Sequence, residues 1–162
     1  MTTPTDAISL MEAVEYIWRE AELLDRQDYK AWLSLWSEEG LYVIPIQRGN
    51  ADHSGELNIA YDNAEMRLAR TKRLKSGFSI SSAPSARTVR TLSRFVLEQG
   101  EGAGVEIRCA QHIVEYKFER SRILAADMTY RLERRGDRIV LAGKEVQLIN
   151  SDDYLWGIGY LL

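Results

Sequence analysis

Residues that bind metals or form cross-links are scarce in this sequence. Its 162 residues include one cysteine, Cys109, and two histidines, His53 and His112. A Rieske iron–sulfur cluster takes two cysteines and two histidines, a mononuclear iron triad takes two histidines and a carboxylate, and a structural zinc site takes four ligands. The counts exclude a Rieske cluster and an internal disulfide. Because the two histidines fall in different predicted elements, a polar loop and a strand, we expect no metal, cofactor or catalytic site in this chain.

Signals for membranes, secretion and nucleic acids are also missing. No apolar run approaches the roughly 18 residues that cross a bilayer, and the first residues lack the charged and apolar regions of a secretory signal. The formal charge is −3, with acidic and basic residues interleaved, so nothing indicates a nucleic-acid partner. Together with the single cysteine, these absences predict a cytoplasmic protein. Without a repeat or a linker, residues 1–162 are expected to form one domain.

Helical patterns dominate the first half. Leu10, Val14, Ile17, Ala21 and Leu24 follow a 4-3-4-3 spacing, which predicts an amphipathic helix over residues 9–26. Asp28 is a suitable N-cap for a shorter second helix, and Gly40 stands where a left-handed C-terminal cap would end it. A strand is expected over 41–46, followed by an exposed loop over 47–60.

A third helix is expected from Asp62, which forms a capping-box-like pair with Glu65, to about Lys75. Its cationic residues are Arg67, Arg70, Lys72, Arg73 and Lys75. Two interpretations remain open for them. They either form a solvated face near the C-terminal end of the helix dipole or face a partner.

From Thr88 onward the helical period gives way to strands. Four are expected, over 88–98, 105–119, 122–134 and 139–149. Glycine-containing turns link the first to the second and the third to the fourth, and both suit antiparallel hairpins. In the second of these, apolar residues move from odd to even positions, which predicts a bulge between Ala110 and Ile113 and a sharp bend. Helices followed by a long, bent, mostly antiparallel sheet indicate an α+β fold shaped like a cone, with the N-terminal helices covering the concave face.

Catalysis by this chain alone has one candidate group. In bent cones of this kind a carboxylate, a histidine and a tyrosine can meet in the interior, and Asp25, Tyr42 and His112 could do so. Such a group suits acid–base chemistry, that is, a stand-alone dehydratase or isomerase. The alternative is a buried polar network in a cone filled by tryptophans. Cys109 lies on an apolar phase of its strand and is expected to be an inert buried thiol.

The C-terminal segment is unusually apolar for a chain end. Two tyrosines, Tyr154 and Tyr160, occur with Trp156 and four leucine or isoleucine residues. Such a segment has to be covered, either by its own domain or by another subunit, and we favour a subunit interface.

Several segments together resemble the small (β) subunit of bacterial aromatic-ring-hydroxylating dioxygenases. The N-terminal block from Tyr16 to Pro45, YIWREAELLDRQDYKAWLSLWSEEGLYVIP, is the most specific. Tyr61-Asp62 at the third helix, Pro84 to Thr88 before the long strands, and Tyr160-Leu161-Leu162 extend the resemblance over nearly the whole chain. A departure is Ser93-Arg94-Phe95, where the family often has Ser-Asn-Val.

The resemblance implies the nuclear-transport-factor-2-like cone fold, which scytalone dehydratase and ketosteroid isomerase also have. It implies a non-catalytic, structural β subunit that forms a homotrimer and joins three large (α) subunits in an α3β3 hexamer for aromatic-compound catabolism. In that family the α subunit holds the Rieske cluster and the mononuclear iron. The oxidoreductase activity therefore belongs to the complete assembly, of which the small chain is one component.

Overall fold

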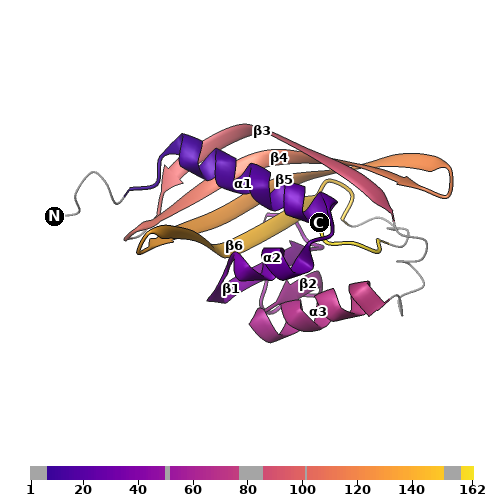
Figure 1. Cartoon of the computed structure of the whole chain (residues 1–162), viewed down its shortest axis with the longest axis horizontal. Coiled ribbons are helices and arrows are strands. Elements are labelled where there is room, and N and C mark those ends of the chain that lie inside the picture. The colour runs from indigo at the N-terminus through magenta and orange to yellow at the C-terminus, as the bar shows by residue number, and fades with distance from the viewer. Residues whose placement is uncertain (1–6, 50–51, 77–85, 101, 152–157) are drawn as a thin grey trace.

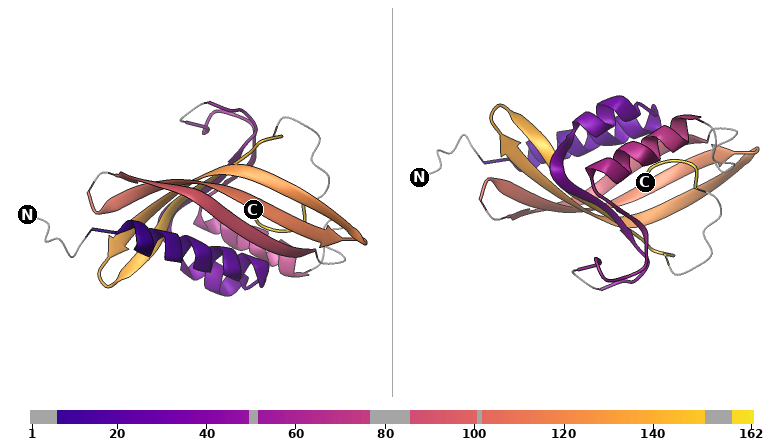
Figure 2. Two further views of the ribbon diagram at one scale, coloured as in Figure 1. Left: turned by 90° about the horizontal axis from the view of Figure 1, so that it is seen from above. Right: turned by 90° about the horizontal axis from the view of Figure 1, so that it is seen from below.

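A computed structural model describes residues 7–49, 52–76, 86–100, 102–151 and 158–162. Three helices lie on one side of a six-stranded sheet (Figures 1 and 2). The helices are α1 (Leu10–Asp25), α2 (Tyr29–Ser34) and α3 (Ala64–Ser76). The strands are β1 (Trp36–Pro45), β2 (Asn58–Asp62), β3 (Arg87–Gln99), β4 (Gly104–Lys117), β5 (Arg120–Arg135) and β6 (Arg138–Leu148).

The sheet has the order β2-β1-β6-β5-β4-β3 and is mostly antiparallel. Only the pair β1–β6 runs parallel, and the long connection that such a pair requires contains β2, α3 and the strands β3 to β5. The helices cover the concave face, and the sheet bends over them (Figure 2). The expected α+β cone and the four long strands are confirmed.

Helix starts follow the capping residues of the sequence. Ser9 caps α1 and forms a capping box with Glu12, whose side chain accepts from the Ser9 backbone N–H at 2.9 Å. Asp28 caps α2 as expected, with its carboxylate accepting from the Ala31 N–H at 3.2 Å. The N-cap of α3 is Asn63, one residue after the expected Asp62. Asn63 accepts from the Met66 N–H, whereas Asp62 ends β2 and forms an ion pair with Arg70.

The strand β2 was missed by the sequence analysis, which placed an exposed loop over 47–60. Residues Asn58–Asp62 pair with β1 in antiparallel register, Tyr61 opposite Val43. A polar, glycine-containing segment precedes this short strand, so no long apolar alternation marks it in the sequence.

Gly40 is not a helix cap, and this prediction is wrong. α2 ends at Ser34, and Gly40 lies inside β1. A side chain there would meet the Trp36 ring at 2.8 Å and the Leu141 carbonyl at 3.1 Å. The Gly40 carbonyl also accepts a hydrogen bond from Arg67, whose guanidinium lies 4.1 Å from the centre of the Trp36 ring. Glycine is needed here for close approach rather than for a left-handed turn.

The expected bulge in β4 is also wrong. β4 pairs with β5 without a break, and its odd residues stay buried from Val105 to Glu115. The irregularity lies in the neighbouring strand β3, between Ser93 and Val96, where Arg94 has φ 61°. The apparent change of phase arises because even residues of β4 near its end are apolar and exposed, while Gln111 and Glu115 occupy the buried face.

The described end of the chain packs into its own core. Tyr160, Leu161 and Leu162 are all buried in the hydrophobic cluster of this chain. For these residues the expected subunit interface is wrong, because they bond to Tyr42, Arg90 and Glu115 of their own chain. Tyr154, Leu155 and Trp156 lie outside the described residues.

Replacing Gly40 with alanine should destabilise the fold by about 1–3 kcal/mol, because a methyl group has to displace the Trp36 ring. Urea unfolding of the Gly40→Ala variant measures this loss. Gly55→Ala is the matched control, since nothing lies within 4 Å of a Cβ at that position. Equal stability of the two variants would contradict the close-packing role of Gly40.

Candidate functional site

The three residues of the predicted acid–base group do not meet. Asp25 at the end of α1 accepts hydrogen bonds from the Thr88 hydroxyl and the Arg90 backbone N–H, both at 2.9 Å, and forms an ion pair with the Arg90 guanidinium. Tyr42 lies in the interior of the cone. His112 lies on the opposite, convex face of the sheet, where it is exposed and stands across from Thr91 and Ala125. The sheet itself separates the histidine from the other two groups.

Tyr42 is fully engaged by the end of the chain. Its hydroxyl donates to the Leu162 backbone oxygen at 3.2 Å and accepts from the Leu162 N–H at 2.9 Å. Burial raises the pKa of Tyr42 well above its ordinary value, so the phenol stays protonated. The Arg90 guanidinium donates to the Leu161 carbonyl, and the Tyr160 hydroxyl contacts Glu115. Residues 160–162 therefore fill part of the interior of the cone.

The centre of the cone holds a buried ion pair that the sequence analysis did not identify. Lys144 on β6 and Glu20 on α1 approach to 2.5 Å, and both side chains are almost fully buried. The Trp32 indole N–H donates to the same Glu20 oxygen at 3.0 Å. Burial lowers the pKa of Lys144, and the nearby Glu20 carboxylate opposes that shift. The sequence does contain a sign of this pair. Glu20 stands three residues after Ile17, so a charged residue falls on the face of α1 that packs against the sheet.

Aromatic side chains fill the space around this pair. The rings of Trp32, Trp36 and Tyr42 pack edge to face, with centroids 5.4 to 6.2 Å apart. Trp18, expected to help fill the cone, is half exposed on the outer side of α1 and packs on Phe95. Cys109 is buried as expected, and burial raises its pKa to about 12, which keeps the thiol protonated and unreactive. The described interior is therefore a packed hydrophobic core around one ion pair, and its cysteine is not poised for reaction.

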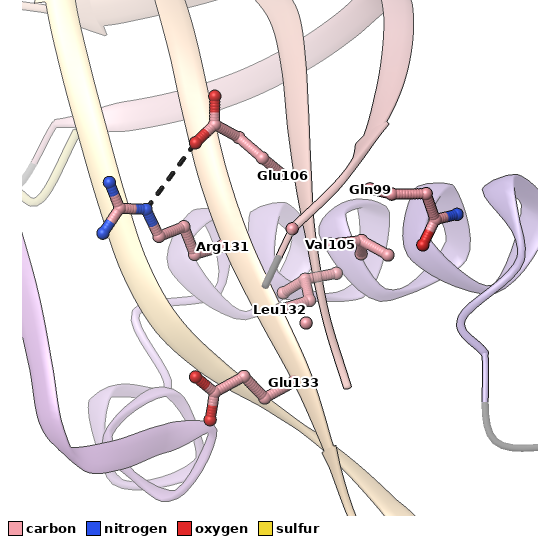
Figure 3. A pocket seen from close by; sticks show the side chains of 8 residues that line it. Gln99, Val105, Glu106, Arg131, Leu132 and Glu133 are labelled. Carbon is pink, nitrogen blue, oxygen red and sulfur yellow. Dashed lines mark ion pairs between the residues drawn. The ribbon is translucent and has the colours of Figure 1, made fainter. Parts of the chain in front are cut away.

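A surface groove of about 570 Å³ lies at one end of the sheet (Figure 3). Its wall includes Gln99 and Glu133, and the Glu106 carboxylate faces the Arg131 guanidinium at 3.6 Å across it. The residues that line it include no histidine, cysteine or serine. We find in it no arrangement for nucleophilic or metal-assisted chemistry.

His53, a residue of the loop that joins β1 to β2, is held between two carboxylates. Its Nδ1 lies 2.9 Å from Glu56 and its Nε2 lies 2.7 Å from Glu145 on β6. Both ring nitrogens must donate to satisfy these acceptors, which requires the protonated imidazolium. Burial lowers the pKa of His53, but the hydrogen bonds and charges of Glu56 and Glu145 outweigh this effect and raise it above its ordinary value. The histidine, only 6% exposed, anchors the loop to the sheet rather than serving as a metal ligand.

Within the described ranges no group of three or more His, Cys, Asp or Glu side chains could hold a metal ion. The donor atoms of a Rieske cluster or a mononuclear iron site are not assembled there, and the sequence has only one cysteine. None of the described helices is long and apolar enough to span a membrane.

Replacing Lys144 with methionine should cost about 3–5 kcal/mol, because Glu20 is left buried without its partner. The double variant Glu20→Gln/Lys144→Met should recover part of this loss, since no unpaired charge remains. Free energies of unfolding from urea titrations test both expectations. A double variant no more stable than Lys144→Met would show that the pair does not act as a unit.

The stabilisation from His53 should depend on pH. Folding raises its pKa above the ordinary 6.5, so its contribution is fully present below about pH 6.5 and is lost as the pH rises through the folded-state pKa. The melting temperature of His53→Gln, compared with the unsubstituted chain between pH 5.5 and 9, should therefore show a difference that shrinks toward high pH. His112→Gln, at an exposed histidine on the convex face, is the control for the change of side chain itself. A difference independent of pH would contradict the imidazolium anchor.

Comparisons with known proteins place this chain in a family. The model of the ring hydroxylating beta subunit matches residues 19–152. The benzoate 1,2-dioxygenase subunit beta of Acinetobacter baylyi is 22% identical over 159 residues, covering 95% of this chain and 93% of that protein.

Solved structures agree on the fold. The beta subunit of benzoate 1,2-dioxygenase from Burkholderia mallei superposes with a TM-score of 0.78 at 24% identity, covering 99% of this chain and 100% of that one. An NTF2-like protein with a cystatin-like fold from Novosphingobium aromaticivorans has a TM-score of 0.56 at 14% identity, over 88% and 91% of the two chains. The expected nuclear-transport-factor-2-like fold is confirmed. Since the family model spans most of the sequence, this chain belongs to the ring-hydroxylating dioxygenase β-subunit family and is a component of such an oxidoreductase.

Proposed function

We propose that this chain, as one domain over residues 1–162, is the non-catalytic, structural β subunit of a cytoplasmic aromatic-ring-hydroxylating dioxygenase. The observation that carries the proposal is the filled cone. Residues 160–162 and the Glu20–Lys144 pair occupy the interior, where stand-alone enzymes of this architecture would need an open pocket. Membership in the β-subunit family implies an α-subunit partner.

The stand-alone dehydratase or isomerase is not retained. It requires Asp25, Tyr42 and His112 to face one another, and the sheet separates His112 from the other two. Asp25 is already saturated by Thr88 and Arg90. The Glu20 carboxylate in the centre of the cone forms an ion pair with Lys144, so it too serves as a structural partner in this proposal.

The iron chemistry of the assembly belongs to the large subunit in this proposal. That subunit would hold a Rieske cluster and a mononuclear iron, whereas the residues of the small chain do not fit either group. We further propose three copies of each subunit, with the β subunits forming a trimer. The small chain then contributes shape and support to the complex and takes no part in oxygen activation.

The purified chain should behave as a trimer without iron or turnover. Light scattering should give three times the 18.5 kDa chain mass, metal analysis should give no stoichiometric iron, and aromatic substrates with a reductase and NADH should not be consumed. Adding the large subunit of the same dioxygenase should yield a hexamer that restores turnover. A monomer that fails to bind the large subunit, or tightly bound iron in the small chain, would overturn the proposal.

A further inference from the structure

The convex face of the sheet carries a group of exposed apolar side chains that the fold does not explain. Val89, Val114 and Ile123 stand side by side on β3, β4 and β5, because Val114 pairs with Val89 on one side and with Ile123 on the other. Val89 is 63% exposed and Ile123 is 67% exposed. With two residues nearer the β4–β5 turn, they form what we call the outer patch: Val89, Val114, Tyr116, Phe118 and Ile123. An exposed apolar cluster with a polar rim marks an interaction surface.

The turn beside the outer patch has an unfavourable sequence for its shape. Lys117 pairs with Arg120, so Phe118 and Glu119 form a two-residue hairpin turn. Their φ values of 53° and 59° are those of a type I′ turn, which favours Asn-Gly. A phenylalanine with positive φ is a strained residue, and its ring is 67% exposed. Strain that the fold does not require is a feature of functional surfaces.

The rim of the outer patch is cationic. Arg87 lies over the Tyr116 ring at 5.5 Å and Lys117 over the Phe118 ring at 5.3 Å. Arg122, at the start of β5, does not belong to this rim, because it pairs with Glu115 on the buried face of the sheet. In a chain with net charge −3 this rim is locally positive. It fits a partner surface that is apolar at its centre and carries carboxylates around it.

A second copy of this chain does not offer that surface. A two-fold contact would set the outer patch against itself, with cations facing cations. Another exposed apolar group, on β2, on the residue before it and on α3, lies beside the cationic residues of α3, so it would be repelled as well. Its members are Leu57, Ile59, Met66 and Leu68.

The exposed apolar residues of α1 do have carboxylates nearby, since Trp18 is flanked by Glu15 and Glu22. However, α1 covers the other side of the sheet (Figure 2). Contacts between opposite sides of successive copies would repeat as an open stack and would not close a ring. A different polypeptide therefore fits the outer patch better than a second copy.

We propose that the outer patch is the docking surface for the large (α) subunit of the dioxygenase. This inference rests on the proposed function, which supplies that partner. The β4–β5 hairpin presents Phe118 at its end, the three β-branched residues form a flat apolar centre, and the cationic rim selects carboxylates on the large subunit.

Two variants of the small chain test the inference. Val89→Thr/Val114→Thr/Ile123→Thr keeps β-branched residues in the strands and removes the apolar centre. Phe118→Asn/Glu119→Gly gives the turn a favourable sequence and removes the exposed ring. Met66→Gln/Leu68→Gln, on the exposed surface of α3, is the matched control. Each is measured for melting temperature, for oligomeric state alone, and by calorimetry for binding to the purified large subunit.

Both patch variants should bind the large subunit at least about tenfold more weakly, as expected when central apolar contacts of an interface are lost. The turn variant should melt at a higher temperature than the unsubstituted chain while binding more weakly, a combination that general misfolding does not produce. The control should bind as the unsubstituted chain does. If the triple threonine variant of the strands fails to fold, the binding measured for the Phe118→Asn/Glu119→Gly variant decides whether the outer patch is the docking surface.

Three outcomes would count against the inference. If the unsubstituted chain does not bind the large subunit, the proposed function fails and the docking surface fails with it. If that chain binds and the patch variants bind equally well, the proposed function stands and the docking surface is elsewhere. If the patch variants bind the large subunit normally but fall apart into monomers on their own, the outer patch is a contact between copies of this chain.

Discussion

The buried ion pair between Glu20 and Lys144 is the contact on which the arrangement of helices and sheet depends. Two charges removed from water are tolerated only when each neutralises the other, so α1 has to present Glu20 to β6 at one rotation and one height. The indole N–H of Trp32, on α2, donates to the same carboxylate, so α1, α2 and β6 meet at this point. Apolar packing alone would allow α1 to slide along the sheet, whereas this pair specifies a single position.

A core arranged in this way leaves no room for chemistry inside the cone. The end of the chain closes the remaining space, with its backbone paired to Tyr42 and Arg90. Relatives of this architecture share the shape, but a shared fold does not carry a shared activity. In this chain the ion pairs Glu20–Lys144 and Asp25–Arg90 and the hydrogen bonds of Tyr42 tie elements of the interior together and therefore hold the structure in place. The surfaces that remain available for function are on the outside, above all the convex face of the sheet.

The outer patch also explains why the sequence pattern of β4 was misleading. A half-buried strand normally alternates apolar and polar residues, so a change of phase indicates a bulge. Here both faces carry apolar side chains near the end of the strand, while the buried face includes Glu115, which Arg122 and Tyr160 satisfy. Alternation reports burial only when one face meets water throughout. A strand that faces a core on one side and presents an apolar outer surface on the other breaks that condition.

The sequence by itself determined the features that depend on neighbouring residues or on counts. The spacing along α1, the cap at Asp28, the long hairpins and the single cysteine could all be read directly, and the family followed from the N-terminal block. Only the tertiary structure decided which distant groups meet: that Asp25 pairs with Arg90, that His112 lies across the sheet from Tyr42, and that residues 160–162 complete the core. The physical reason is that these contacts depend on strand order and register, which join residues more than sixty positions apart and leave no local pattern in the chain.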